Sequence, residues 1–203
     1  MKDYPSIDAT VRGGTYYVFG KYDGSSLRSE WDPKKGFWKH GKRNGLLDHS
    51  NPHLLRGPGL FREKYEEDLS RIFRDARWRK VVVFYELWGP RSFAGLHEED
   101  DAHTVTLFDV AADRHGILPP NEFLRLLRGV DHAALLHHGS VGEIVDQVRD
   151  GTLPGMPFEG VVCKSSEFAS PGLPRMFKVK NQAWYARLRE RCRGDETLFR
   201  SLA

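Results

Sequence analysis

The sequence predicts an α+β domain in which helices cover antiparallel sheets. Short runs of β-branched and aromatic residues recur along the 203 residues, as expected for strands. One segment, residues 58–80, instead places apolar residues at helical spacing. Strands and helices alternate, but without the regular strand–helix–strand repeat of a parallel sheet. Hydrophobic residues make up 39% of the chain, which is enough to build a core.

In the first third of the chain we expect two strands, a basic segment and a loop. Segments 13–24 and 26–31 are predicted strands on either side of the turn Asp23-Gly24. Segment 35–45 is aromatic and basic and ends at a glycine. Segment 51–59 is rich in Pro and Gly and is predicted to be a loop.

A helix and a buried strand are expected next. The helix is predicted over residues 58–80, with Pro58 near its start, because one face carries apolar residues at spacings of 4, 4, 3 and 4. These residues are Phe61, Tyr65, Leu69, Ile72 and Ala76. The apolar run 80–89 that follows is a predicted buried strand.

The second half is predicted to mix strands, loops and short helices. Segment 97–101 is a polar loop, and 102–111 is a strand. A turn at Gly116 leads to a helix after Pro120, and His137-His138 is interpreted as a solvated helix end. The remaining predicted elements are a short helix (141–151), two strands (158–165 and 175–180) separated by a loop (167–174), and a closing helix (181–194).

Composition sets limits on the class of protein. The formal charge of +3 is compatible with a nucleic acid partner but does not argue for one. The two cysteines, Cys163 and Cys192, form neither a disulfide framework nor a cysteine metal site. The start of the chain has no apolar signal region, and no apolar run approaches 18 residues. We expect an intracellular, soluble protein without a membrane partner.

Charged residues inside or beside the predicted strands are the main indication of a site. Burial of a charge within an apolar run is costly unless the charge is paired. Several such positions on separate strands are better explained by one shared polar cleft than by scattered surface charges. These positions are Lys21, Glu86, Asp109, Glu159, Lys178 and Lys180.

A lysine in such a cleft can act on a nucleotide covalently. The sequence has neither a G-x-x-x-x-G-K-[ST] phosphate loop nor G-x-G-x-x-G. From an ordinary pKa of about 10.4, roughly one lysine in 2,500 is neutral at pH 7, a handicap of about 4.6 kcal/mol. We expect Lys178, Lys180 and a divalent metal to lower the pKa of Lys21. Glu159 is the candidate metal ligand and Phe108 a surface for base stacking.

The stretch "KYDGSS" resembles motif I of the covalent nucleotidyltransferases, the superfamily of polynucleotide ligases and RNA capping enzymes. In that family the motif's lysine, here Lys21, forms a lysyl-nucleotide. "GKRNG" resembles the basic segment after motif I, which implies that Arg43 lies near the ribose and the nucleic acid phosphates. "FYELWG" resembles motif III, whose glutamate, here Glu86, holds the ribose hydroxyl.

Three further motifs follow in the family's order. "LFDV" resembles motif IIIa, which implies that Phe108 stacks on the base. "FEGVVCK" resembles motif IV, with Glu159 serving the metal, and "FKVK" resembles motif V, with Lys178 and Lys180 at the α-phosphate. The resemblance runs from about residue 16 to residue 180 and implies a nucleotidyltransferase (ligase adenylation) domain around a nucleotide cleft. Lys21, Lys178 and Lys180 are the catalytic candidates.

Within the superfamily the resemblance favours an ATP-dependent RNA ligase. Motif III reads E-L-x-G, as in ligases, and Ser25-Ser26 follows motif I as in several RNA ligases, where most DNA ligases carry an arginine at the position of Ser26. The implied cofactors are ATP and Mg²⁺, with Mn²⁺ as an alternative, and the implied partners are RNA ends, or DNA ends. A DNA ligase catalytic domain and a non-catalytic module that binds nucleic acid ends remain open.

The sequence departs from the family pattern at two places, which concern the reading of the base and the presence of an accessory domain. Many ligases have a glutamate just before the motif I lysine that helps read adenine, whereas this chain has Phe19 and Gly20. Only residues 181–203 follow motif V, too few for an OB-fold or a helical accessory domain. We therefore expect a single domain over residues 1–203, which is either a minimal ligase or a domain that borrows a clamp from an accessory protein.

Two sets of residues keep open assignments. The arginines at 187, 189, 191 and 193 form either a solvated helix face or a surface that follows nucleic acid phosphates. Asp23 and Asp109 are either structural partners in a turn and a strand or, for Asp109, a group near the metal.

Overall fold

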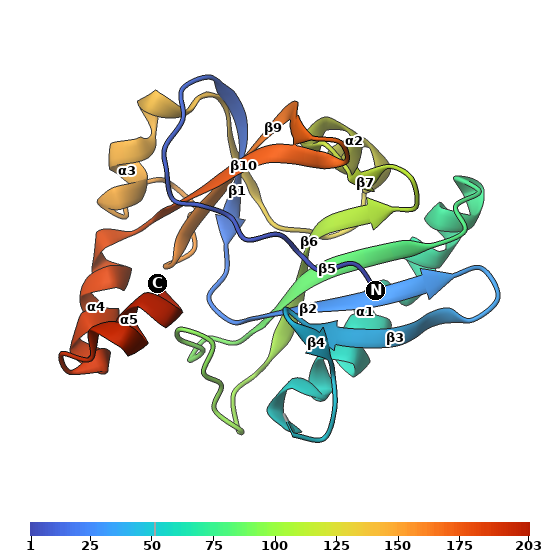
Figure 1. The fold of residues 1–203 in the computed structure, drawn as a ribbon, viewed down its shortest axis with the longest axis horizontal. Coiled ribbons are helices and arrows are strands. Elements are labelled where there is room, and N and C mark those ends of the chain that lie inside the picture. The colour runs from blue at the N-terminus through green and yellow to red at the C-terminus, as the bar shows by residue number, and fades with distance from the viewer. Residues whose placement is uncertain (51) are drawn as a thin grey trace.

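Two antiparallel sheets and the helices around them make up the computed structural model, which describes residues 1–50 and 52–203 (Figure 1). The small sheet has four strands in the order β10-β9-β1-β8, and the large sheet has six in the order β4-β3-β2-β5-β6-β7. The predicted α+β class is therefore confirmed. Among the described residues, no helix combines the length and the apolar composition needed to cross a membrane.

The small sheet consists of β1 (Thr15–Lys21), β8 (Leu135–Ser140), β9 (Gly160–Ser170) and β10 (Leu173–Lys180). The large sheet consists of β2 (Ser25–Asp32), β3 (Gly36–Lys42), β4 (Gly45–Leu46), β5 (Val81–Trp88), β6 (Thr104–Ala112) and β7 (Gly116–Ile117). The turn Asp23-Gly24 does not close a hairpin. It carries the chain from one sheet to the other, because β1 pairs with β8 and β9 while β2 pairs with β3 and β5.

Helices cover the outer faces of both sheets. The long helix α1 (Arg56–Asp75) packs its apolar face on the large sheet, and Phe61, Tyr65, Leu69 and Phe73 join the main core there. The helix α3 (Val145–Arg149) packs on the small sheet in a second core. The other helices are η1 (Pro52–Leu54), α2 (Pro120–Leu126), η2 (Val141–Glu143), α4 (Gln182–Cys192) and α5 (Glu196–Leu202).

The N-terminal segment crosses from one sheet to the other (Figure 1). At its start, the Met1 amino group pairs with Glu30 of β2, and Asp3 pairs with Arg28. At its other end, the Asp8 carbonyl accepts a hydrogen bond from the Lys178 backbone N–H of β10 at 2.8 Å. The segment thus closes one side of the space between the sheets.

Several sequence predictions are wrong in detail. The helix predicted over 58–80 begins earlier, at Arg56, and ends at Asp75, so part of the predicted loop 51–59 is helical; residue 51 itself lies outside the described residues. His137-His138 lies in the strand β8 rather than at a helix end. The predicted loop 167–174 lies largely within β9 and β10, where irregular pairing accommodates Pro174.

Candidate active site

A pocket of about 710 Å³ lies between the two sheets. Its walls come from β1, β9 and β10 of the small sheet and from β2, β5 and β6 of the large sheet. The N-terminal segment, α4 and α5 supply the remaining sides. Because these elements come from all parts of the chain, the pocket depends on the complete fold.

Strand register places the predicted lysines on one face of the small sheet. Side chains alternate along a strand, so the residues between Val161, Cys163, Phe177 and Val179 of the second core point the opposite way. In the antiparallel ladder Gly160 lies opposite both Lys21 and Lys180, and Val162 lies opposite both Phe19 and Lys178. The row formed by Lys21, Gly160 and Lys180 therefore carries two lysines. The neighbouring row, formed by Phe19, Val162 and Lys178, is partly apolar.

Gly160 is required in the charged row. Its φ of +133° is rarely adopted by other residues, and an added Cβ would lie 2.2 Å from the backbone carbonyl of Val179. The absence of a side chain at this position leaves Lys21 and Lys180 facing each other across β9. The close approach of the β10 backbone thus explains why a glycine follows Glu159 in "FEGVVCK".

Glu159 joins the two lysines. Lys21 Nζ donates a hydrogen bond to Glu159 Oε2 at 2.7 Å, and Lys180 Nζ lies 3.0 Å from Glu159 Oε1. The Glu159 residue is only 5% exposed, so both ion pairs are largely shielded from water. Lys180 Nζ also lies 3.6 Å from the centre of the Trp184 ring of α4, a favourable cation–π distance.

The pKa of Lys21 does not shift in the direction expected from the sequence. Burial disfavours the charged form of Lys21, but the charges of Glu159 and Glu86 outweigh burial and raise its pKa. The expected lowering of the Lys21 pKa by neighbouring cations is thus wrong for this arrangement, because a carboxylate lies closest to its amine. Burial lowers the pKa of Lys180 to about 8, although Glu159 opposes the shift. Burial and the charge of Lys21 also lower the pKa of Lys178.

Glu86 enters the pocket from β5 of the large sheet. Burial raises its pKa to about 8, and the charge of Glu159 adds to this increase, while Lys21 opposes it. A carboxyl group with this pKa is mostly protonated at pH 7, and it can then donate a hydrogen bond. A sugar hydroxyl is a suitable acceptor for such a group.

Phe108 of β6 lines the pocket beside a buried polar cluster. Its ring lies at 6.4 Å from Phe84 in a stacked arrangement and at 5.1 Å from Tyr4 in an edge arrangement. Behind the ring, Lys164 Nζ donates hydrogen bonds to the Phe108 carbonyl at 2.7 Å and to Asp109 Oδ1 at 2.8 Å. The position of the Phe108 ring is therefore set by packing and by polar contacts on its own strand.

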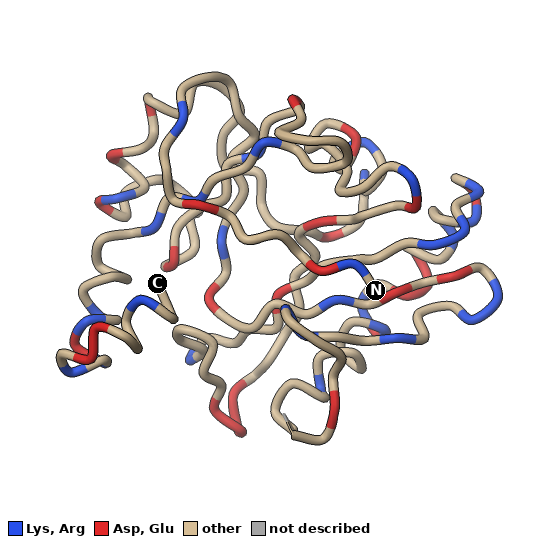
Figure 2. Tube along the Cα trace, viewed as in Figure 1, with Lys and Arg blue, Asp and Glu red and all other residues tan. Residues whose placement is uncertain are grey.

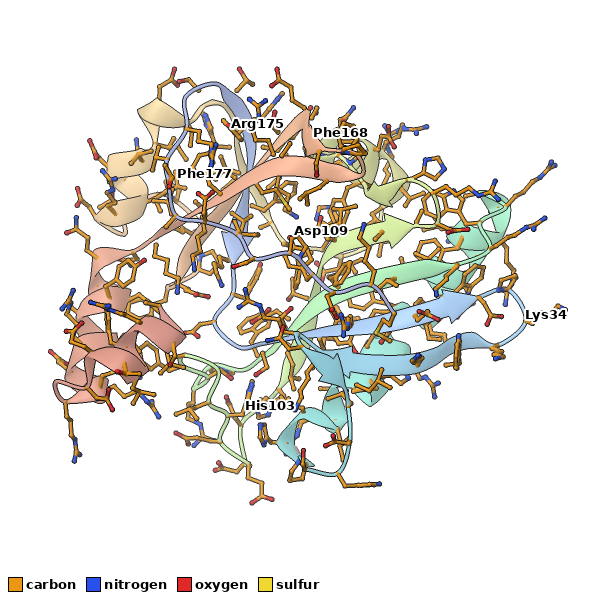
Figure 3. All side chains as sticks on the ribbon, viewed as in Figure 1. Lys34, His103, Asp109, Phe168, Arg175 and Phe177 are labelled. Carbon is orange, nitrogen blue, oxygen red and sulfur yellow. The ribbon has the colours of Figure 1, made fainter. Side chains whose placement is uncertain are left out.

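Asp109 is the exception among the six charged positions. The other five line the pocket, whereas Asp109 lies behind the wall with 1% exposure, near the middle of the molecule (Figure 3). It accepts hydrogen bonds from Lys164 and, at 2.5 Å, from the Tyr4 hydroxyl. Asp109 is thus a structural partner. The sequence reasoning missed Lys164 and Tyr4, although Lys164 is a charged residue within the apolar run 158–165.

Asp23 fixes the turn after Lys21. Its two carboxylate oxygens accept hydrogen bonds from the Ala94 backbone N–H at 2.6 Å and from Trp184 Nε1 at 2.5 Å. An added Cβ at Gly24 would lie 2.1 Å from the Leu87 carbonyl, so the turn passes too close to β5 for any side chain. The Asp-Gly pair therefore ties the end of β1 to α4 and to the segment after β5.

The predicted basic residues have separate positions. Arg43 lines the pocket, where its guanidinium lies 3.4 Å from Ser6 Oγ. Arg187 and Arg191 of α4 lie over the Phe93 ring at 4.3 and 5.7 Å, and Arg189 lies over Phe199 at 4.5 Å. These arginines of α4 hold neighbouring segments against the helix.

The carboxylates of the pocket fit a magnesium ion in donor type. Glu159 offers the hard oxygen ligands that Mg²⁺ prefers. Within residues 1–50 and 52–203, no group of three or more His, Cys, Asp or Glu side chains forms a cage for a metal. Mg²⁺ is commonly held by one or two carboxylates together with substrate phosphates, which is the arrangement that this pocket can offer.

No protein-family model and no curated protein matches the sequence. Among solved structures, an archaeal ATP-dependent RNA ligase is similar, with a TM-score of 0.64, 19% identity, and coverage of 95% of this chain and 52% of that one. A Naegleria gruberi RNA ligase mutant without ligands has a TM-score of 0.59 and 17% identity over 93% of this chain and 60% of that one. Another mutant of the same ligase, with ATP and Mn, has a TM-score of 0.57 and 18% identity over 87% and 52%.

These similarities define the class of fold, which is shared with part of each of these RNA ligases. Among them, the archaeal ATP-dependent RNA ligase has a TM-score of 0.64 to this chain. The chain spans about half the length of the first of these ligases.

Proposed function

We propose that this protein is an ATP-dependent RNA ligase that joins 5′-phosphate and 3′-hydroxyl ends through a lysyl-AMP intermediate. The observation that carries the proposal is the row Lys21–Glu159–Lys180 at one part of a pocket that also contains Phe108. A nucleophilic amine, two further cations and an aromatic ring are the groups that nucleotide transfer to a lysine requires.

In the first step, the neutral Nζ of Lys21 forms a bond to the α-phosphorus of ATP. The bond from that phosphorus to the bridging oxygen breaks, and pyrophosphate leaves with the electron pair. Lys178 and Lys180 lie beside Lys21 and stabilise the charge that develops on the phosphate. A divalent metal held by Glu159 would add positive charge at the same phosphate.

The Lys21 amine must lose a proton before it attacks. The 2.7 Å contact with Glu159 is the main favourable interaction of the charged amine. Loss of this contact removes the largest contribution that raises the pKa of Lys21 and leaves burial and the repulsion from Lys178 against the charges of Glu86 and Asp23. Activation of Lys21 therefore requires that Glu159 turn to another partner when ATP binds.

Two later steps complete the reaction. An oxygen of the RNA 5′-phosphate attacks the phosphorus of lysyl-AMP, and the Lys21 amine leaves and regains its proton. The 3′-hydroxyl of the second end then attacks the phosphorus of the adenylated end, and AMP leaves as the phosphodiester forms. RNA rather than DNA is proposed because serine, not arginine, occupies position 26.

The protonated state of Lys21 favours one rival function. A module that binds nucleic acid ends without catalysis would keep the amine charged, as the ion pair with Glu159 does here. Incubation with labelled ATP and Mg²⁺, followed by a denaturing gel, separates the two functions. A labelled protein band supports the ligase, and its absence under all metal and pH conditions supports the binding module.

A panel of substrates tests the second half of the proposal. Nicked, splinted and single-stranded ends of RNA and of DNA are presented to the adenylated protein. Sealing of RNA ends at a higher rate than DNA ends is expected, whereas faster sealing of DNA would identify a DNA ligase domain. Addition of an accessory protein tests whether the domain borrows a clamp.

A further inference from the structure

The charges around the pocket are not balanced. Among the described residues that line it, lysines and arginines outnumber aspartates and glutamates by seven to three. Basic positions recur along β10 and α4, and α5 carries Arg200 (Figure 2). One of the seven, Lys164, pairs with Asp109 behind the pocket wall, and an excess of positive charge remains.

Three cations that line the pocket have no Asp or Glu partner among the described residues. Lys21 and Lys180 pair with Glu159, whereas Arg43, Lys178 and Arg200 have no Asp or Glu within 4.0 Å among the described residues. Arg43 contacts the Ser6 hydroxyl, and Lys178 Nζ donates to the Ala203 carbonyl at 3.0 Å. Arg200 of α5 makes no hydrogen bond or ion pair with the described part of the chain.

Lys178 lies close enough to Lys21 and Arg43 to be affected by their charges. The pKa of Lys178 is lowered by burial first, then by the charge of Lys21, and also by the charge of Arg43. The contact between Lys178 and Ala203 brings α5, which carries Arg200, to the same side of the pocket. Repulsion among unpaired cations disfavours the fold unless an anion binds between them.

The position of the group indicates which anion binds. Lys178 is two residues from Lys180 on β10, so the unpaired cations adjoin the row that contains Lys21. In a nucleoside triphosphate the β- and γ-phosphates adjoin the α-phosphate, and they carry most of the negative charge. Arginine is well suited to such a group because its planar guanidinium binds phosphate oxygens in pairs.

We propose that Arg43, Lys178 and Arg200, which line the same pocket as Lys21, form the binding site for the β- and γ-phosphates of ATP. This inference rests on the proposed function and adds a residue of α5 to the site. The same groups hold the pyrophosphate as the bond to the α-phosphorus breaks. Arg200 is then a catalytic residue, since it contacts the leaving group.

The test compares binding of AMP with binding of α,β-methylene-ATP, which cannot transfer its nucleotide to lysine. Affinities are measured by isothermal titration calorimetry for the wild type and for Arg200→Gln. We expect Arg200→Gln to weaken binding of the triphosphate analogue by roughly tenfold or more, as for loss of a charged hydrogen bond, and to leave AMP affinity within about twofold. Arg200→Lys keeps the charge and should give a smaller loss.

Arg149→Gln is the matched control, because it removes an exposed arginine on α3 outside the pocket. This control should change neither affinity. Equal affinities of wild type and Arg200→Gln for the triphosphate analogue would overturn the proposal. So would an Arg200→Gln variant that binds the analogue normally but seals 5′-adenylated RNA slowly, because the arginine would then serve RNA phosphates.

The comparison of the affinities for AMP and α,β-methylene-ATP does not depend on whether the protein is a ligase. A wild type that forms no lysyl-AMP would contradict the proposed function. The ratio of the two affinities would still decide the role of Arg200, since neither ligand reacts.

Discussion

Two titratable groups of the pocket should give the free energy of unfolding a minimum near pH 8. Burial raises the pKa of Glu86 from 4.5 to about 8 and lowers the pKa of Lys180 from 10.5 to about 8. Below pH 8 the folded protein holds a proton on Glu86 that the unfolded chain lacks, so stability falls as pH rises. Above pH 8 the unfolded chain holds a proton on Lys180 that the folded protein lacks, so stability rises.

The magnitude follows from these values and from the other groups that titrate. Each pH unit contributes at most about 1.4 kcal/mol per group. Burial lowers the pKa of His40 and His97 to about 4, which opposes the effect of Glu86 below pH 6.5. Burial raises the pKa of Cys163 to about 12, which opposes Lys180 above pH 9. We therefore expect a fall of up to about 2 kcal/mol from pH 6.5 to 8 and a rise of up to about 1.4 kcal/mol from pH 8 to 9.

Urea unfolding, followed by tryptophan fluorescence at pH 6.5, 8 and 9, measures both changes. Glu86→Gln should remove the fall, and Lys180→Met should remove the rise. Lys34→Met, which changes an exposed lysine in a turn, should leave both in place. A wild-type curve that is flat or has its maximum near pH 8, or variants that keep the wild-type curve, would refute the assignment of these buried ionisations.

Three further predictions concern single residues of the site. Glu159→Gln and Lys178→Ala should each slow lysyl-AMP formation by more than about a hundredfold, because Glu159 would hold the divalent metal and Lys178 acts at the α-phosphate. Near wild-type rates in single-turnover assays would exclude those roles. Phe108→Ala should weaken ATP binding by roughly 5- to 150-fold, the range for loss of base stacking. Phe108→Tyr should reduce ATP affinity only slightly. An unchanged ATP affinity of Phe108→Ala, measured by calorimetry, would indicate that Phe108 serves the core. Asp109→Ala should lower the free energy of unfolding by about 3–5 kcal/mol because it leaves Lys164 buried without a counter-charge, and a loss below about 1 kcal/mol in urea would contradict the structural assignment.

The strands that carry Lys21 and Lys180 were predictable because their sequences carry strong local signals. The run before Lys21 is β-branched and aromatic, and the strands around Glu159 and Lys180 are apolar with isolated charges. Their charges meet because the register of β1, β9 and β10 aligns Lys21, Gly160 and Lys180. The sequence indicated that these residues share a cleft but not which of them pair.

Other elements were missed because distant segments stabilise them. The strand β8 has the polar sequence "LLHHGS" and forms by pairing with β1, more than 100 residues away. Pro174 suggested a loop, but irregular pairing between β9 and β10 tolerates a residue without an N–H. The contacts of Asp109 with Tyr4 and Lys164 join three remote segments, so no local pattern could reveal them.

The Lys21 pKa was predicted with the wrong sign for a similar reason. The sequence identified the cations that lower it but gave no distances. In the folded protein Glu159 lies at 2.7 Å from the amine, and its charge and hydrogen bond, together with the charges of Glu86 and Asp23, outweigh burial. The balance between a nearby carboxylate and several cations depends on geometry that only the structure provides.

The central claim is that Lys21 carries the nucleotide. The most direct measurement is peptide mass spectrometry of the protein after incubation with ATP and Mg²⁺, in the wild type and in Lys21→Ala and Lys21→Arg. The account predicts AMP on Lys21 alone in the wild type and no adduct in either variant, since alanine has no nucleophile and a guanidinium stays protonated. AMP on another residue, or an adduct that persists in Lys21→Ala, would contradict the account.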